Sequence, residues 1–235
     1  MVRKGEGPDT GRVERCRRVM VFASKGGVGK TTVASNLLVS AALDGIEAIG
    51  VDLDGQRHLS RWFSKREQHP AYSQMAAFSV GDAPLNEWQE VLTQTTDSDL
   101  AVFDMPPGIE GDTASILSAL APKMDLILIP TLPEEPSYSL VTDFMASFQK
   151  QRLRALFVLN RVIRGRNSLR EAKTDLGRHG PVCPVEITTR DEIWRAFKEG
   201  TAAAEIGDSP AQTEFHALWL HVQAALGLRA KEIAA

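Results

Sequence analysis

The sequence predicts one large α/β domain with a doubly wound, mostly parallel sheet flanked by helices. Three observations on the 235-residue chain support this fold class. Short apolar runs alternate with stretches of helical periodicity, which is the order that builds right-handed crossovers. The central runs are continuously apolar rather than alternating, as strands covered on both faces should be. A glycine-rich loop joins the first run directly to the first helical stretch.

Strands and helices are expected in strict alternation along the chain. Strands are expected at 18–24, 48–52, 100–104, 126–130, 156–160 and 185–188. Helices are expected at 30–43, 59–65, 85–95, 113–120, 137–151, 168–176, 192–199 and 211–226. The stretch 68–82 is the least regular and is expected to be a loop with a short strand. We therefore expect a flexible N-terminal tail at 1–17 and a single domain at 18–235.

The composition narrows the class of protein. An apolar content of 43% is ample for a core, and a net charge of −3 gives no overall attraction to nucleic acid. The two cysteines, Cys16 and Cys183, suggest neither a disulfide framework nor a four-ligand metal site. No apolar run approaches the roughly 18–20 residues of a membrane span. These observations favour a reduced, cytoplasmic protein.

Charge is distributed unevenly along the chain. The stretch 80–140 holds eleven acidic residues and one basic residue, whereas 150–178 holds nine basic residues and two acidic ones. The local balances are therefore −10 and +7. A basic segment of this kind is either a solvated, ion-paired face or a surface for a polyanion.

The octapeptide at 25–32 predicts a phosphate-binding loop. Its glycines allow the backbone to wrap a triphosphate and to aim N–H groups at the oxygens. Lys30 would add charge at the β and γ phosphates, and the Thr31 hydroxyl would bind Mg²⁺. Two features are unusual: Ser24 stands where a first glycine is common, and Lys25 follows it. The expected nucleotide-binding residues of the loop are Gly26, Gly27, Val28, Gly29, Lys30, Thr31 and Thr32.

Polar residues at the ends of three expected strands extend this site. Asp104 ends one strand and precedes Pro-Pro-Gly, while Asp52 and Asp54 follow another. With Thr31 these carboxylates form a plausible Mg²⁺–water cluster at one sheet edge. Asn160 ends a further strand, where its amide could contact a base. Each residue also has an ordinary alternative, because aspartates at strand ends often cap helices or form turns.

These motifs together resemble those of the ParA/MinD family of deviant Walker A ATPases. The segments 25–32, 52–56 and 104–108 resemble the family's Walker A, switch I and switch II/Walker B motifs, and the likeness runs from about 18 to 226. One departure is Gly55, where many ParA members carry proline. The resemblance implies a P-loop ATPase fold with ATP and Mg²⁺ as ligands.

The resemblance also implies a role for each matching residue. Lys25 resembles the signature lysine that reaches the partner's nucleotide across an ATP-bound homodimer. Lys30 and Asp54 would be catalytic, the aspartate orienting the hydrolytic water. Thr31, Asp52 and Asp104 would lie at the metal, and Asn160 would contact adenine. A cation supplied by a second chain couples ATP binding to dimerisation.

Members of this family differ in what the dimer binds. We expect nonspecific DNA binding through the basic segment, release by a ParB-like or cargo-adaptor activating protein, and a cytoplasmic or nucleoid-associated location. The DNA-binding candidates are Arg161, Arg164, Arg166, Arg170 and Arg190. A MinD-like membrane positioner is the first alternative; it is disfavoured because the apolar stripe of the last helix has core-facing spacing. An ATP-dependent ligase or synthetase is the second.

Overall fold

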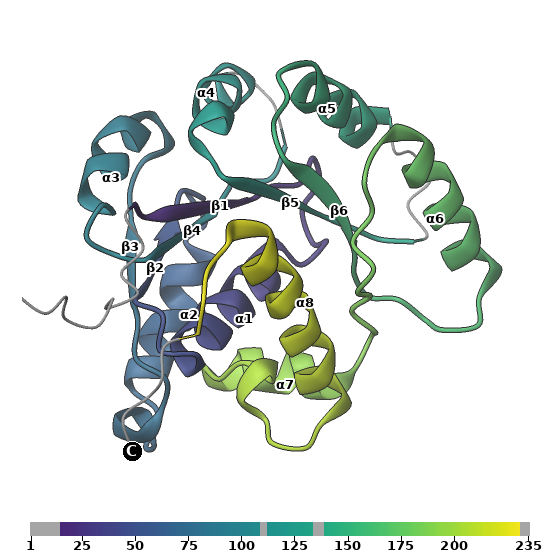
Figure 1. Ribbon diagram of the computed structural model, residues 1–235. Coiled ribbons are helices and arrows are strands. Elements are labelled where there is room, and N and C mark those ends of the chain that lie inside the picture. Colours follow the sequence, from purple (N-terminus) through teal and green to yellow (C-terminus); the bar gives the residue numbers. More distant parts are fainter. Residues whose placement is uncertain (1–14, 109–111, 134–138, 231–235) are drawn as a thin grey trace, which may run out of the picture.

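The computed structural model describes residues 15–108, 112–133 and 139–230. Six parallel strands form one sheet in the order β3-β2-β4-β1-β5-β6 (Figure 1). The strands are β1 (Arg17–Val21), β2 (Ala48–Asp52), β3 (Ser79–Asp82), β4 (Leu100–Asp104), β5 (Leu126–Thr131) and β6 (Ala155–Leu159). The helices are α1 (Lys30–Leu43), α2 (His58–Glu67), α3 (Trp88–Gln94), α4 (Thr113–Leu120), α5 (Ser139–Lys150), α6 (Asn167–His179), α7 (Asp191–Glu199) and α8 (Pro210–Leu226). The doubly wound parallel fold predicted from the sequence is therefore confirmed.

The strand order places a topological switch point beside β1. The chain leaves β1 towards β2 and β3 on one side, and later adds β5 and β6 on the other. In open parallel sheets ligands bind at such a point, outside the carboxyl ends of the strands. The loop that follows β1 lies at this place and carries the glycine-rich motif.

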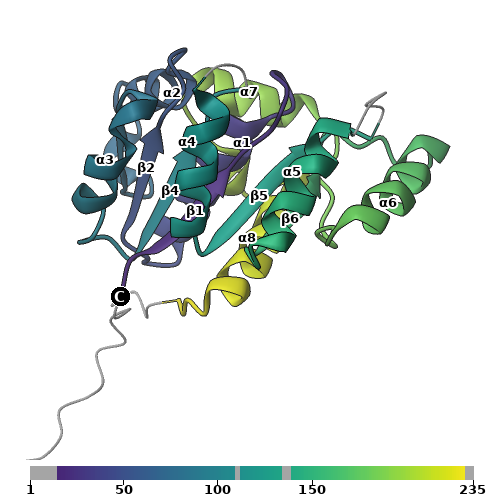
Figure 2. The same ribbon diagram turned by 90° about the horizontal axis from the view of Figure 1, so that it is seen from above.

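Helices cover both faces of the sheet and bury two apolar cores. One face is covered by α1, α2, α7 and α8, and the other by α3, α4, α5 and α6 (Figures 1 and 2). Side chains of β1 and of Phe22, which follows it, alternate between the cores: Val19 and Val21 face the first, Met20 and Phe22 the second. Both faces being buried explains why the strands read as continuous apolar runs.

The last helix belongs to the first core, as its spacing predicted. Phe215, Leu218 and Trp219 of α8 are at most 1% exposed. The Trp219 indole N–H donates to Asp44 Oδ2 at 2.6 Å, which ties α8 to the end of α1. In the described part of the chain no helix is long and apolar enough to cross a membrane.

The strand expected at 185–188 is wrong. Only isolated bridges connect this segment to its neighbours, at Phe157–Val182 and Val162–Thr188. The Phe157 carbonyl accepts from Cys183 N, but the Leu159 carbonyl accepts from Ile187 N rather than from residue 185. Two extra residues therefore interrupt the parallel register beside Pro184, which lacks an N–H to donate.

The remaining boundaries agree to within a few residues. The irregular stretch 68–82 does contain a short strand, β3, and β1 ends at Val21 because the chain then turns into the glycine-rich loop. Residues 1–14 of the expected tail, and 137–138 of an expected helix, lie outside the described residues.

Candidate nucleotide-binding site

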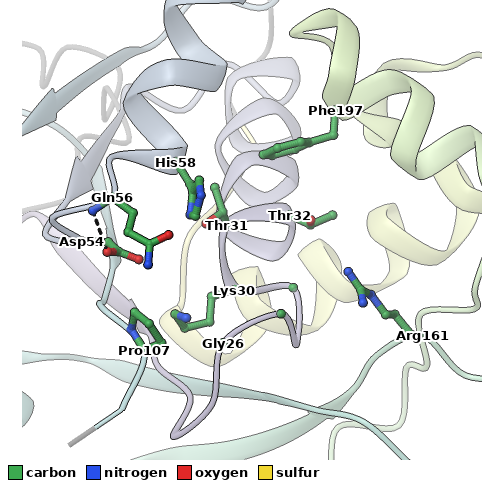
Figure 3. A pocket seen from close by; sticks show the side chains of 12 residues that line it. Gly26, Lys30, Thr31, Thr32, Asp54, Gln56, His58, Pro107, Arg161 and Phe197 are labelled. Carbon is green, nitrogen blue, oxygen red and sulfur yellow. Dashed lines mark hydrogen bonds between the residues drawn. The ribbon is translucent and has the colours of Figure 1, made fainter. Parts of the chain in front are cut away.

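A cavity of about 280 Å³ opens at the carboxyl edge of the sheet, above the N-terminus of α1 (Figure 3). Its floor is the glycine-rich loop, and its walls come from the loop after β2, the loop after β4, α7 and the loop after β6. The lining residues are Gly26, Gly27, Gly29, Lys30, Thr31, Thr32, Asp54, Gln56, His58, Pro107, Arg161 and Phe197. A helix N-terminus with free backbone N–H groups favours an anion at this position.

Two glycines allow the loop to adopt its shape. Gly27 and Gly29 have φ values of +78° and +93°, in the left-handed region that residues with a Cβ avoid. Gly29 is also crowded, because an added Cβ would lie 2.2 Å from Asn160 Nδ2. The loop is therefore closed from behind by β6 as well as by its own glycines.

Lys30 is buried and points towards Pro107 in the cavity (Figure 3). Burial lowers the pKa of Lys30, and this effect is opposed by the carboxylates of Asp104 and Asp54. The ammonium group thus lies close to two acids within a low-dielectric wall. A bound phosphate would give it a further anionic partner at short range.

Thr31 and Asp104 form the centre of the acidic part of the site. The Thr31 hydroxyl donates to Asp104 Oδ2 at 2.6 Å, while the other carboxylate oxygen, Oδ1, is buried without a hydrogen-bond partner. Burial raises the pKa of Asp104 to about 7, against the lowering effects of Thr31 and Lys30. A buried carboxylate with an unsatisfied oxygen beside a hydroxyl fits a divalent cation.

The ligand set suits Mg²⁺ better than a metal held by protein alone. Among the described residues no group of three or more His, Cys, Asp or Glu side chains could hold a metal ion. Mg²⁺ commonly takes one or two protein oxygens and completes its shell with nucleotide phosphates and water. Thr31 and Asp104 would supply the protein oxygens here.

Asp52 and Asp54 shape the loop between β2 and α2. Asp52 pairs in register with Asp104, and its oxygens accept from the N–H groups of Asp54 at 3.0 Å and Ser60 at 2.9 Å. Asp54 accepts from Gln56 N at 2.9 Å and lines the cavity (Figure 3). Asp52 therefore organises this loop and the first turn of α2, and its expected place at the metal stays a prediction.

Lys25 and Asn160 differ from the other predicted residues in their positions. Lys25 is exposed on the loop and is not part of the cavity lining, unlike Lys30. Asn160 is 4% exposed and donates from Nδ2 to the Val28 carbonyl at 2.7 Å. The adenine contact expected of Asn160 stays a prediction.

Four lining residues were not among the predicted site residues. Gln56 and Pro107 come from the loops after β2 and β4, and His58 is the first residue of α2; all three lie close in sequence to predicted residues. Phe197 comes from α7 and points across the cavity above Thr32 (Figure 3). The first three could have been predicted from the sequence, because they lie next to the motifs. Phe197 could not, because only tertiary packing brings α7 to the cavity.

The predicted DNA-binding arginines fall into two groups. Arg164 and Arg190 each contact Glu214 Oε1 at 3.1 Å, so one buried carboxylate partly neutralises both. Arg161, Arg166 and Arg170 are exposed, as Arg164 also is, and Arg161 lines the cavity. The structure therefore does not bring all five together as one uniform basic patch.

The model of the CobQ/CobB/MinD/ParA nucleotide-binding domain matches residues 19–203, which span the strands, the glycine-rich loop and the cavity walls. The chain belongs to this family. It is thus a ParA/MinD-family nucleotide-binding ATPase domain.

Solved structures of individual proteins resemble this ParA/MinD-family domain at low sequence identity. MinD from Pyrococcus horikoshii, solved with Mg-ADP, has a TM-score of 0.70 and 19% identity, with coverage of 93% of this chain and 100% of that one. A putative plasmid partition protein from Borrelia burgdorferi, bound to AMPPNP, has a TM-score of 0.66 and 15% identity, with coverage of 89% and 99%. At these identities the likeness shows the fold alone.

One curated relative has higher identity over a shorter region. An iron-sulfur cluster carrier protein from Pseudomonas fragi is 30% identical over an alignment of 141 residues, and the match covers 48% of this chain and 49% of that protein. The chain thus aligns with about half the length of this relative.

Proposed function

We propose that this protein is an ATP-driven molecular switch that dimerises with ATP and Mg²⁺. The dimer binds DNA nonspecifically and positions a plasmid, a chromosome region or a protein cargo. An activating partner, a ParB-like protein or a cargo adaptor, then triggers hydrolysis and release. The location is cytoplasmic, and nucleoid-associated while DNA is bound.

The single observation that carries the dimer proposal is the contrast between the two lysines of the loop. Lys30 is 7% exposed and lines its own cavity, whereas Lys25 is exposed on the same loop and lies outside that cavity. Lys30 serves the nucleotide of its own chain. Lys25 reaches the nucleotide of a second chain in the proposed dimer, where such a cation stabilises phosphate charge only after the two chains meet.

Hydrolysis would use groups that already surround the cavity. Lys30 stabilises charge on the phosphates, and Asp54 orients the attacking water. Thr31 and Asp104 would hold Mg²⁺, which would supply positive charge to the phosphates. The Asp52 carboxylate keeps Asp54 in place by accepting a hydrogen bond from the backbone N–H of Asp54.

The DNA proposal rests on the exposed arginines of the segment before and within α6. Arg166 and Arg170 are exposed, and they line one groove together with Lys173, which pairs with Glu186. Cations in such a row bind phosphates without reading sequence, by releasing counterions. Arg164 and Arg190 contribute less, because Glu214 holds both.

A cluster carrier activity is not part of the proposal, although one relative is an iron-sulfur cluster carrier. The chain's two cysteines are both buried, Cys16 in the core on one face of the sheet and Cys183 in the core on the other. They cannot jointly ligate a cluster without unpacking the fold. A MinD-like membrane role would need a membrane-binding segment, and the apolar stripe of α8 is used in the core.

The dimer proposal is tested by light scattering on a sizing column with ATP and Mg²⁺. Wild type should elute as a dimer with ATP and a monomer with ADP, and Lys25→Ala should stay monomeric while still binding nucleotide. Asp54→Ala should accumulate the ATP dimer with little turnover. ATP-dependent dimers of Lys25→Ala in normal yield would contradict the role of the exposed lysine.

The DNA proposal is tested by mobility shift with ATP across a salt series, with anionic lipid vesicles in parallel. Arg166→Ala/Arg170→Ala should weaken binding and reduce the slope of log K against log salt by roughly 2, about 0.9 for each phosphate that the variant no longer neutralises. Arg178→Ala is the matched control, because Arg178 is an exposed arginine near the end of α6 and lies outside the groove that these two arginines line. Vesicle binding without DNA binding would replace the proposal by the membrane alternative.

A further inference from the structure

The loop between β2 and α2 separates two cavities. Asp54 lines the nucleotide cavity on one side of this loop and a second cavity, of about 410 Å³, on the other. The wall of the second cavity also includes Asp82 at the end of β3, Leu85 and Thr113, the first residue of α4. A Cβ added at Gly55, the next residue of the loop, would meet no atom within 4 Å. The loop therefore has open space behind it, on the side away from the nucleotide cavity.

The position of Asp54 depends on both ends of this loop. At the start, the Asp54 N–H donates to Asp52 Oδ1 at 3.0 Å. At the end, Asp54 Oδ1 accepts from Gln56 N at 2.9 Å (Figure 3), and the Asp54 carbonyl accepts from Arg57 N at 2.7 Å. The start is fixed to the sheet through Asp52, so the end of the loop decides whether the carboxylate stays at the nucleotide cavity.

Arg57 closes the loop in an unusual backbone conformation. Its φ is +53°, in the left-handed region that residues with a Cβ rarely adopt. Its carbonyl accepts from Arg61 N at 3.0 Å, which begins α2. Residues in such conformations persist where the surrounding structure holds them, and they gather at functional sites. A contact of the Arg57 side chain is therefore expected to help hold this conformation.

That contact is an ion pair between the Arg57 guanidinium and Asp82 Oδ2, at 2.9 Å. Asp82 lies in register with Asp52 of the neighbouring strand, and the Ala83 N–H donates to the Asp52 carbonyl at 3.1 Å. The carboxylate is thus fixed to the sheet, and the pair ties the end of the loop to it. The two side chains are 61% and 34% exposed, so salt can screen the pair.

We propose that Arg57 is a positioning residue for ATP hydrolysis, because its ion pair with Asp82 holds the loop so that Asp54 faces the nucleotide cavity. The inference rests on the proposed role of Asp54 in orienting the attacking water. Arg57 does not line the nucleotide cavity, so it acts through Asp54. When the pair opens, the loop shifts towards the second cavity and carries Asp54 away from the phosphates.

The first test is the turnover of Asp82→Asn, which removes the pair and leaves the strained residue in place. Its kcat should fall by about two- to fivefold, the effect that one exposed ion pair allows. Its KM for ATP should stay within about twofold, because no group that lines the nucleotide cavity is changed. Arg61→Ala is the matched control: it removes an exposed arginine one turn further along α2 and should leave kcat unchanged. A wild-type kcat in Asp82→Asn would overturn the proposal.

Salt and charge reversal test whether the charges themselves act. The ratio of wild-type to Asp82→Asn kcat should fall towards unity as NaCl is raised to about 1 M, because salt screens the pair. Arg57→Asp places two like charges together and should lower kcat further than Asp82→Asn does. Arg57→Asp/Asp82→Arg restores opposite charges and should regain most of that loss. A ratio that does not change with salt, or a double variant no faster than Arg57→Asp, would overturn the proposal.

Backbone hydrogen exchange tests the ion pair without turnover. In the nucleotide-free protein, Asp82→Asn should speed exchange of the Gln56 and Arg57 N–H groups by about two- to fivefold, because the loop opens more often. Unchanged exchange would overturn the proposal. Asp54→Ala separates this result from the proposed function. If Asp54→Ala hydrolyses ATP normally, the proposed role of Asp54 fails; if Asp54→Ala is inactive while Asp82→Asn is normal, only the role of Arg57 fails.

Discussion

Removing the carboxylate of Glu214 should destabilise the protein and loosen the segment that leads into α7. Glu214 accepts hydrogen bonds from Thr188 N at 2.8 Å and Thr188 Oγ1 at 2.6 Å, and pairs with Arg164 and Arg190. It is the point where α8 holds the chain between the isolated bridge at Thr188 and the helix that carries Phe197. Glu214→Ala leaves the Thr188 and Arg190 donors without their carboxylate partner.

The size of the effect follows from the burial of the group. The Glu214 side chain is 8% exposed, and losing one partner of a buried pair costs about 3–5 kcal/mol. Arg164 is 67% exposed, so its pair contributes little and the lower end applies, about 3 kcal/mol. For a chain of this length the melting temperature should fall by roughly 6–12 °C, at about 2–4 °C per kcal/mol.

The effect should depend on pH with a definite sign. Burial acts to raise the pKa of Glu214, but the hydrogen bonds from Thr188 and the charge of Arg190 outweigh it, so the pKa is lowered from 4.5. A lowered carboxylate pKa contributes stability that is fully present above 4.5 and is lost as the pH falls through the folded-state pKa. The difference in melting temperature between wild type and Glu214→Ala should therefore be largest at pH 7 and should become smaller below pH 4.5.

The assay is calorimetric or fluorescence-monitored melting of both proteins across this pH range. Glu214→Gln, which keeps the volume but removes the charge, should lie between wild type and Glu214→Ala at neutral pH. Asp175→Ala removes an exposed pair and should change the melting temperature by only about 1–2 °C. If this difference in melting temperature were equal at all pH values, the charge of Glu214 would not be its cause. If the difference were negligible, Glu214 would not stabilise the fold at all.

Two other buried groups give separate predictions. Asp104→Asn should raise the melting temperature of the nucleotide-free protein, because it replaces a buried carboxylate that has one unsatisfied oxygen; calorimetric titration should show that Mg²⁺ no longer tightens nucleotide binding. A less stable Asp104→Asn that keeps its Mg²⁺ dependence would contradict this. Arg66→Ala should lower the free energy of unfolding, measured in urea, by about 3–5 kcal/mol. The reason is that Glu205 loses the buried arginine that contacts it at 2.6 and 2.9 Å. The double variant Arg66→Met/Glu205→Met should regain most of this loss, and no recovery would show that packing rather than charge is responsible.

Much of the fold could be predicted because its signals are local. Continuous apolar runs, helical periodicity and the glycine loop each occupy a few adjacent residues, so β2, β4, α1 and α4 have the expected bounds. The strand expected at 185–188 failed for a non-local reason. Its apolar residues suit a strand, but the register beside β6 is interrupted at Pro184, and register depends on the neighbour across the sheet.

The sequence by itself determined the phosphate loop, its two lysines and the acids at the strand ends. Each of these motifs is a short run of adjacent residues, and each follows a strand that ends at the same edge of the sheet. Only the tertiary structure decided which of these side chains face the cavity. It buried Lys30 and left Lys25 exposed, and it used Asp52 to hold a loop. It also brought Asn160 behind Val28, Phe197 over the cavity and Glu214 between two arginines. These contacts join residues distant in sequence, and they depend on how helices pack on the sheet, which the local pattern does not encode.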